Sequence, residues 1–336
     1  MSATVPPRPS IGRVIGLAFL WFSLAVIAVA LLYAAAFGPT DASAPSAQFL
    51  VEPDESVEQV GKALAVQGYV RSPFIFELAY LRATPNGKGI RPGQYEISKS
   101  MDAWAIGAAL VRLPSVAWVK IPVGLRKEQI ADLLADSLEW SDAQRTAWLA
   151  ATASTSVNYQ EGVYFPDTYF IPTDEDPALI AERMRNRFKE VFAPYAAEAV
   201  KKGIPWTKVV TIASLIQREA GSASDMPIIS GIIQNRLKTG MPLAIDATLQ
   251  YMEGNEENGW WPKPHAAATY PASPFNTYKE TGLPPHPIAN PGLVAINAAL
   301  NPTATDCLFY IHDNNGQIHC SKTYSGQMAN IKKYLR

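Results

Sequence analysis

The apolar residues of the chain are concentrated most strongly near its N-terminus. Residues 14–40 contain no formal charge, and residues 14–37 form a nearly continuous apolar run. At about 1.5 Å per residue, a helix over this run is long enough to cross the roughly 30 Å hydrocarbon core of a bilayer. The pattern predicts a transmembrane helix at residues 14–37.

The residues on either side of this run predict its orientation. Arg8 and Arg13 precede it, whereas residues 38–51 contain no Lys or Arg. The positive-inside rule then places residues 1–13 in the cytoplasm and the body of the chain outside it. The alternative is a cleaved signal peptide, because Ala42-Ser43-Ala44 has the small residues of a cleavage site. The apolar run is longer than the roughly 7–15 residues of a signal peptide, which favours a retained anchor.

Beyond the apolar run, short periodic segments predict a small α/β module. Residues 38–47 are small, Pro-containing and aperiodic, which is typical of a short flexible tether. Residues 48–156 then alternate between strand-like and helix-like patterns. The predicted strands lie at residues 48–53, 93–97 and 117–122, and a predicted helix lies at 102–110.

Two further helices of this module have recognisable starts. Ser56 begins one through a capping box with the glutamine three residues later. Ser72, followed by proline, begins the other. This second helix carries Phe74, Leu78 and Leu81 on one face.

The remaining residues, 157–336, predict a mixed α+β domain. Their most distinctive segment is a proline-rich loop at 260–291, and an ordered loop of this length usually builds a site or a groove. The whole chain is therefore expected to be of the α+β class. The predicted elements are helices at 177–200, 207–220, 227–238, 292–300 and 325–335, and a hairpin at 307–320.

Charge excludes one class of partner. The chain has 29 Lys and Arg against 30 Asp and Glu, which gives a net charge of -1. Its basic residues form no cluster interleaved with aromatic residues, so nucleic acid is not expected as a partner.

The two cysteines lie at the two ends of the predicted hairpin. In the expected register, the residue opposite Cys320 is Tyr310 or a direct neighbour. Cys307 would then lie about 7–13 Å further along its strand, which is too far for a disulfide. The spacing predicts two free, half-buried thiols.

Familiar catalytic and metal-binding patterns are missing from the sequence. It contains no HExxH, GxSxG, Walker A or Ser-x-x-Lys pattern. His319 and Cys320 are strand neighbours that point to opposite faces, so they would not join one metal site. We expect neither a metal nor a cofactor.

Glu219 is the strongest candidate for chemistry. It falls seven residues after Ile212 on the apolar stripe of a helix for which Thr207 is the expected cap. Burial and the negative end of the helix dipole would both raise its pKa, as a proton donor near neutral pH requires. The alternative, favoured by periodicity alone, is a carboxylate at the edge of the helix that is paired with Arg218 or Arg236.

Residues 209–221 (VVTIASLIQREAG) resemble the catalytic-helix motif of the endolytic murein transglycosylase family (MltG or YceG-like). Further blocks of this family follow in the same order, and the resemblance covers residues 11–336. It implies that residues 48–156 form a LysM-like module with connecting helices and that residues 157–336 form the catalytic domain. The matching blocks are EG at 161–162, FPDTY at 165–169, NRL at 235–237, DATLQY at 246–251, FNTY at 275–278 and TGLPP at 281–285.

The resemblance implies cleavage of nascent peptidoglycan glycan strands between N-acetylmuramic acid and N-acetylglucosamine without water, leaving a 1,6-anhydro end and ending strand elongation. Glu219 would act as acid and then as base. The polar residues expected to orient the sugars, or alternatively to hold the loops, are Asp246, Thr248, Gln250, Asn276 and Tyr278. Two alternatives stay open: a hydrolase that pairs Glu219 with Asp246, and a peptidoglycan-binding scaffold without catalysis.

The same resemblance implies a single-pass protein of the cell inner membrane with its catalytic domain in the periplasm, and peptidoglycan synthases as partners. Trp260 and Trp261 could stack on sugars or simply pack. The chain departs from the family pattern at four positions, which concern the rim of the groove and the hairpin: Ala247, His286, Ile318 and Gln327.

Overall fold

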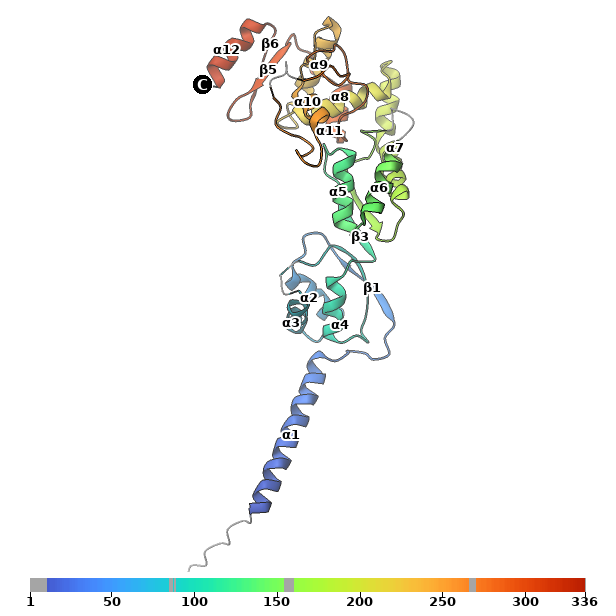
Figure 1. The fold of residues 1–336 in the computed structure, drawn as a ribbon, viewed down its shortest axis with the longest axis vertical. Coiled ribbons are helices and arrows are strands. Elements are labelled where there is room, and N and C mark those ends of the chain that lie inside the picture. The colour runs from blue at the N-terminus through green and yellow to red at the C-terminus, as the bar shows by residue number, and fades with distance from the viewer. Residues whose placement is uncertain (1–10, 85–86, 88, 154–159, 266–269, 336) are drawn as a thin grey trace, which may run out of the picture. The chain divides into compact units, whose positions relative to one another are not determined.

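The computed structural model describes residues 11–84, 87, 89–153, 160–265 and 270–335. The chain forms two compact units, residues 1–118 and 119–336 (Figure 1). The domain boundary expected at residue 156 stays a prediction. Within the second unit, α5 (Lys127–Leu138) contacts α6 (Asp142–Thr152), and α6 contacts the long helix α7 (Pro177–Lys201).

The first unit begins with the apolar helix α1 (Ile11–Phe37). Residues 15–37 of this helix are long and apolar enough to span a membrane, and their side chains are largely exposed. This agrees with a single-pass anchor. The orientation expected from Arg8 and Arg13 stays a prediction.

The connection that follows α1 is held against the rest of the first unit. The Thr40 hydroxyl donates to the Gly68 carbonyl at 2.6 Å, and the Thr40 and Asp41 amides both donate to the Lys99 carbonyl. Arg71 donates to the Pro39 carbonyl at 3.2 Å. These bonds differ from the expected flexible tether, because a polar, aperiodic sequence does not reveal which backbone groups find partners.

Strands of an antiparallel ladder and three helices complete the first unit. β2 (Gly93–Ser98) lies between β1 (Ser46–Val51) and β3 (Val116–Lys120), with Phe49 opposite Tyr95. The helices are α2 (Val57–Val66), α3 (Pro73–Ala83) and α4 (Ala103–Val111). The mixed α+β class is confirmed, and the LysM-like character of this unit stays a prediction.

The helix starts of this unit follow the sequence closely. Ser56 forms the predicted capping box, and the Ser72 hydroxyl accepts from the backbone of the third residue of α3. These caps satisfy amide groups that have no partner within the helix. The core is apolar and includes Phe49, Val60, Leu64, Phe76, Ile97 and Ile106.

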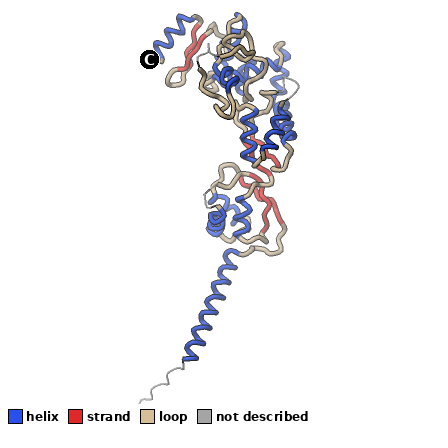
Figure 2. Tube along the Cα trace, viewed as in Figure 1, coloured by secondary structure: helices blue, strands red, loops and turns tan. Residues whose placement is uncertain are grey.

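The second unit is mainly helical and is organised around α8 (Trp206–Glu219). This helix contacts α7, α9, α10 and α11, so it is the central element of the unit. Figure 2 shows helices joined by long loops, with the strand pair β5–β6 near the C-terminus. The remaining elements are β4 (Thr168–Pro172), α9 (Met226–Thr239), α10 (Asp246–Glu253), α11 (Leu293–Leu300), β5 (Phe309–His312), β6 (Ile318–Ser321) and α12 (Tyr324–Tyr334).

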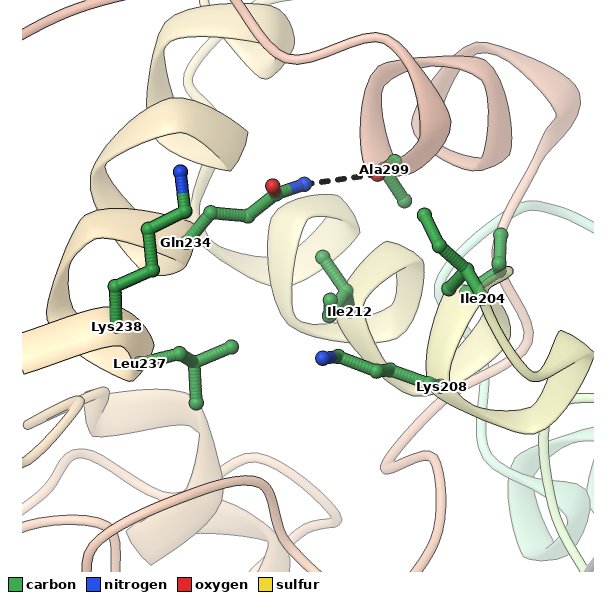
Figure 3. Close-up of a pocket in the computed structure, with 8 residues that line it drawn as sticks. Ile204, Lys208, Ile212, Gln234, Leu237, Lys238 and Ala299 are labelled. Atoms are coloured by element: carbon green, nitrogen blue, oxygen red, sulfur yellow. Dashed lines mark hydrogen bonds between the residues drawn. The ribbon is translucent and has the colours of Figure 1, made fainter. Parts of the chain in front are cut away.

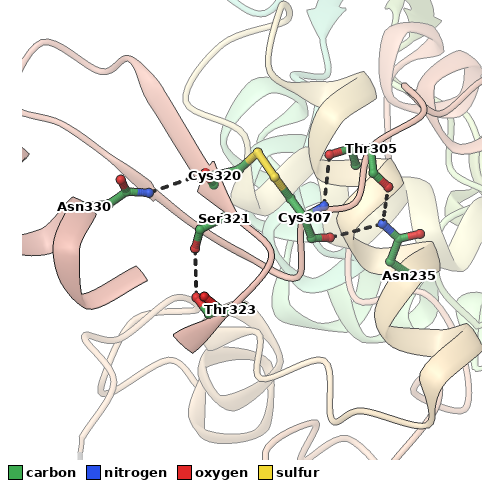
Figure 4. The surroundings of a disulfide bond; sticks show 7 residues. All are labelled: Asn235, Thr305, Cys307, Cys320, Ser321, Thr323 and Asn330. Atoms are coloured by element: carbon green, nitrogen blue, oxygen red, sulfur yellow. Dashed lines mark hydrogen bonds between the residues drawn. A yellow bond between two sulfur atoms is a disulfide. The ribbon is translucent and has the colours of Figure 1, made fainter. Parts of the chain in front are cut away.

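The hairpin β5–β6 contains a disulfide, so the prediction of two free thiols was wrong. Tyr310 pairs with Cys320, as the predicted register has it. However, β5 begins only at Phe309, and the chain before it bends so that the Cys307 and Cys320 Cα atoms are 5.8 Å apart (Figure 4). Asn235 of α9 stabilises the bend by donating to the carbonyls of Thr305 and Cys307.

Candidate active site

Glu219 is the last residue of α8 and is positioned by the buried face of that helix. The predicted stripe is confirmed, since Val209, Ile212, Ala213 and Ile216 are all buried. The helix starts at Trp206 with Pro205 as its cap, so the expected cap at Thr207 was wrong. Pro205 holds the extended backbone that precedes a helix, which leaves Thr207 inside the first turn.

The carboxyl group of Glu219 lies among groups from two other elements, β5 and α10. The Tyr310 hydroxyl of β5 donates to Glu219 Oε2 at 2.6 Å, and the Ala247 amide of α10 also donates to this carboxylate. Although the residue as a whole is half-buried, loss of water around the carboxyl group is the main cause that raises the pKa of Glu219. The nearby charge of Asp246 raises it further, whereas the two hydrogen bonds lower it.

Neither arginine forms the ion pair that would make Glu219 a purely structural residue. The guanidinium carbon of Arg218 lies 3.9 Å from the centroid of the Trp261 ring. Arg236 donates to the carbonyls of Leu308 and Leu243. Among the described residues, no salt bridge includes Glu219. Its environment is therefore that of an unpaired acid with a raised pKa, as proton donation requires.

Asp246 and Tyr278 form a second polar pair beside this carboxylate. Asp246 is the exposed first residue of α10, and the Tyr278 hydroxyl donates to its Oδ1 at 2.5 Å. Burial raises the pKa of Tyr278, and the bond to Asp246 raises it as well. These two predicted site residues are therefore brought together at Glu219.

The other three predicted sugar-binding residues form hydrogen bonds that hold loops. The hydroxyl of the buried Thr248 donates to the Ile245 carbonyl and also forms a hydrogen bond with the Thr277 hydroxyl. The buried Asn276 donates to the Pro271 carbonyl. Gln250 donates to the Pro262 carbonyl. These contacts fit the scaffolding alternative.

The paired tryptophans also have internal partners. Trp260 donates from its indole nitrogen to Asp132, and Trp261 donates to Gln129, both on α5. Arg126 lies over both indole rings. The pair therefore fastens the proline-rich loop to α5, which fits the packing interpretation.

The hairpin contributes two residues that sequence reasoning did not place at the site, Tyr310 and His312. Tyr310 contacts Glu219 directly, and His312 Nε2 lies 3.4 Å from Asp225 Oδ2, next to Gly221. Gln327, one of the departures from the family pattern, donates to the Tyr310 carbonyl. The sequence predicted the hairpin that carries both residues, but it gave no signal that the hairpin packs against α8.

One cavity of the second unit lies apart from Glu219. A cavity of about 270 Å³ lies between α8, α9 and α11, with Gln234 bonded to the Ala299 carbonyl (Figure 3). Glu219 does not line it, and it holds no carboxylate. Within the described ranges, no three His, Cys, Asp or Glu side chains are placed to hold a metal ion.

Comparison with known proteins gives one consistent result. The sequence matches the model of the YceG-like family over residues 49–333. It is 30% identical to an endolytic murein transglycosylase of Bacillus subtilis, over 83% of this chain and 82% of that protein. It is 26% identical to the protein of the same name from Streptococcus pneumoniae D39, over 88% of this chain and 60% of that one.

A solved structure supports the fold. The crystal structure of a YceG-like protein from Listeria monocytogenes superposes with a TM-score of 0.62 and 25% sequence identity. The match covers 84% of this chain and 98% of that chain.

Proposed function

Since this chain belongs to the YceG-like family, we propose that it is a lytic transglycosylase that cuts peptidoglycan glycan strands endolytically. The observation that carries the proposal is the environment of Glu219. Its carboxyl group has a raised pKa, no ion-pair partner among the described residues and a hydroxyl donor at 2.6 Å. The names of the relatives supply the class of substrate.

The proposed reaction uses Glu219 twice. Protonated Glu219 gives its proton to the glycosidic oxygen as the bond from the muramic acid C1 breaks. The resulting carboxylate takes the proton of the muramic acid 6-hydroxyl while its oxygen bonds to C1, so the acid is regenerated and no water is consumed. The products are an N-acetylglucosamine end and a 1,6-anhydro-N-acetylmuramic acid end.

The hydrogen-bond donors around Glu219 suit the second half of this cycle. The Tyr310 hydroxyl and the Ala247 amide stabilise the carboxylate that forms after the first proton transfer. Asp246 and Tyr278 are proposed to face the substrate beside it. The charge of Asp246 raises the pKa of Glu219, so this carboxylate is the candidate for the second acid of the hydrolytic alternative.

Cleavage in nascent strands, with termination of elongation, is the finer part of the proposal. The apolar α1 would hold the enzyme at the cell inner membrane with its second unit in the periplasm, where new strands emerge. Peptidoglycan synthases are the expected partners there.

Mass spectrometry of the products tests the reaction. Purified full-length protein is incubated with uncrosslinked glycan strands, and anhydro ends, lighter by one water than hydrolysed ends, are expected. Glu219→Gln keeps the shape of the side chain and is expected to lose at least about a hundredfold in rate. Hydrolysed ends would support the Asp246-assisted hydrolase, and absence of cleavage by a correctly folded wild type would support the scaffold.

A further inference from the structure

Helix α3 carries an apolar face that the described residues leave uncovered. Phe74, Leu78 and Leu81 are 68%, 42% and 60% exposed. Their spacing of four and three residues puts them in one stripe. The predicted face therefore exists, but it points outward, while Phe76 and Tyr80 fill the core. Large apolar side chains gathered on one exposed helix face mark an interaction surface.

Both ends of α3 are tied to the place where α1 ends. Just before α3, Arg71 donates to the Pro39 carbonyl, and Pro39 is two residues, or at most about 7 Å, beyond the last residue of α1. At the other end of α3, the Arg82 guanidinium lies 5.4 Å from the centroid of the Trp104 ring. Figure 1 shows α3 and α4 beside the C-terminal end of α1.

Trp104 links this helix to the aromatic end of α1. Its ring stacks on Phe37 with centroids 4.9 Å apart, and its indole nitrogen donates to the Tyr33 hydroxyl at 2.7 Å. Tryptophan and tyrosine concentrate at the interface between water and membrane. The cluster of Tyr33, Phe37 and Trp104 therefore fits the membrane surface. Arg82 of α3 contacts this cluster through Trp104, and Arg71 contacts the chain two residues beyond Phe37.

The charges beside the stripe fit a lipid surface. Arg71 and Arg82 are exposed, and Arg82 lies next to Leu78, four residues earlier. Glu77, which is half-buried, lies on the other border of the stripe. An apolar stripe with a basic border is the pattern of a helix that lies in the membrane interface.

We propose that α3 lies on the bilayer surface from which α1 emerges. Phe74, Leu78 and Leu81 enter the boundary between headgroups and acyl chains, and Arg71 and Arg82 contact anionic headgroups. The inference rests on the proposed anchoring by α1 and adds to it a second, surface-bound element. It makes the first unit a membrane-bound platform.

Spin labelling of the full chain tests this placement. Leu78→Cys is labelled with a nitroxide and reconstituted into vesicles of phosphatidylethanolamine and phosphatidylglycerol. Because the native cysteines form a disulfide, the label reacts with the new thiol alone. Accessibility to oxygen is expected to exceed accessibility to a water-soluble nickel chelate severalfold. The matched control, Leu179→Cys on α7, is 54% exposed and is expected to show the reverse.

A third label keeps the two proposals separate. Val26→Cys lies in α1 and reports whether the anchor is inserted. A label at Val26 in water would contradict the anchoring itself. A label at Val26 in lipid with one at Leu78 in water would overturn the α3 proposal alone. Exclusion of both reagents at Leu78 would indicate a protein contact, such as a second copy, and would also overturn it.

The contribution of the basic border is tested in the same vesicles. Arg71→Glu combined with Arg82→Glu is expected to raise the nickel accessibility of the Leu78 label severalfold, because the headgroups then repel the helix. An unchanged value would contradict the proposed headgroup contacts.

Discussion

The Tyr310 hydroxyl is the side-chain contact that most directly lowers the proton affinity of Glu219. It donates to the carboxylate, so it opposes the pKa increase that burial causes. In Tyr310→Phe the pKa of Glu219 is expected to rise further. If Glu219 is the acid, the alkaline limb of the kcat/KM profile moves to higher pH. The rate at neutral pH falls about tenfold or more, because a hydrogen bond to a charged group is lost.

A matched tyrosine separates this effect from general damage. Tyr324→Phe removes the hydroxyl of a residue that is 67% exposed and that packs its ring on Phe309. Its rate and pH profile are expected to equal those of the wild type. An unshifted alkaline limb in Tyr310→Phe would argue against Glu219 as the titrating acid.

Glu161 is a second buried acid, and its titration is expected to change the stability of the fold. Asn290 and the Gly162 amide donate to one of its oxygens and the Lys127 amide to the other, while burial raises the pKa of Glu161 to about 8. A folded-state pKa above the unfolded value means that the folded chain binds more protons. The stabilisation is complete below about pH 4.5 and is lost as pH rises to about 8, at no more than about 1.4 kcal/mol per pH unit.

Thermal unfolding of the full chain in detergent between pH 4 and 9 measures this dependence. Glu161→Gln is expected to flatten the decline of the second unit's melting temperature between about pH 4.5 and 8, because glutamine cannot ionise. Glu257→Gln, a change at an exposed residue, is expected to leave the decline intact. The same slope in all three proteins would show that Glu161 is ionised in the folded chain.

At the scale of elements, the disulfide hairpin holds Tyr310 against α8. The bond closes a short loop, since Cys307 and Cys320 are 13 positions apart. Cross-linking a loop of this size stabilises the closed form by about 3 kcal/mol. Cys307→Ser combined with Cys320→Ser is expected to loosen the hairpin and to lower the cleavage rate severalfold. Hydrogen exchange of residues 305–324 is expected to increase.

Reduction provides the control for this variant. Dithiothreitol is expected to slow the wild type to the rate of the double serine variant and to leave the variant itself unchanged. Equal rates with and without the bond would mean that strand pairing and the Gln327 contact suffice to position Tyr310.

Local patterns explain which elements could be predicted. The α8 stripe and Glu219 at its end follow from helical periodicity, and the Ser56 and Ser72 caps follow from the next few residues. Tyr310 could not be placed, because it meets Glu219 across 91 positions and only tertiary packing brings them together.

The bend before β5 shows why the disulfide was missed. The predicted register was right, but the distance between the two cysteines was estimated along a straight strand. The chain bends instead near Thr305 and Cys307, where Asn235 donates hydrogen bonds to both carbonyls. Similarly, Thr248 and Asn276 look like sugar ligands in sequence, since a buried polar side chain with internal partners has no distinct pattern.

At the scale of the whole molecule, the retained anchor is open to direct measurement. The apolar run is longer than a signal peptide requires, so protein isolated from membranes is expected to keep residues 14–37. Intact mass spectrometry checks this. Ala42→Leu combined with Ala44→Leu removes the small-residue site and is expected to give the same processing. A shorter mass for the wild type alone would show cleavage.

The hydrogen-bonded connection after α1 also fixes the rotation of the first unit about the axis of this helix. Hydrogen bonds hold Pro39, Thr40 and Asp41 to the rest of the first unit. Trp104 contacts Tyr33 and Phe37 in the last turns of α1. If a flexible linker joined α1 to the first unit, α1 could rotate about its own axis without rotating that unit. Here rotation of α1 also rotates the rest of the first unit. Contacts made by one side of α1 inside the bilayer therefore also determine the orientation of this unit about the bilayer normal.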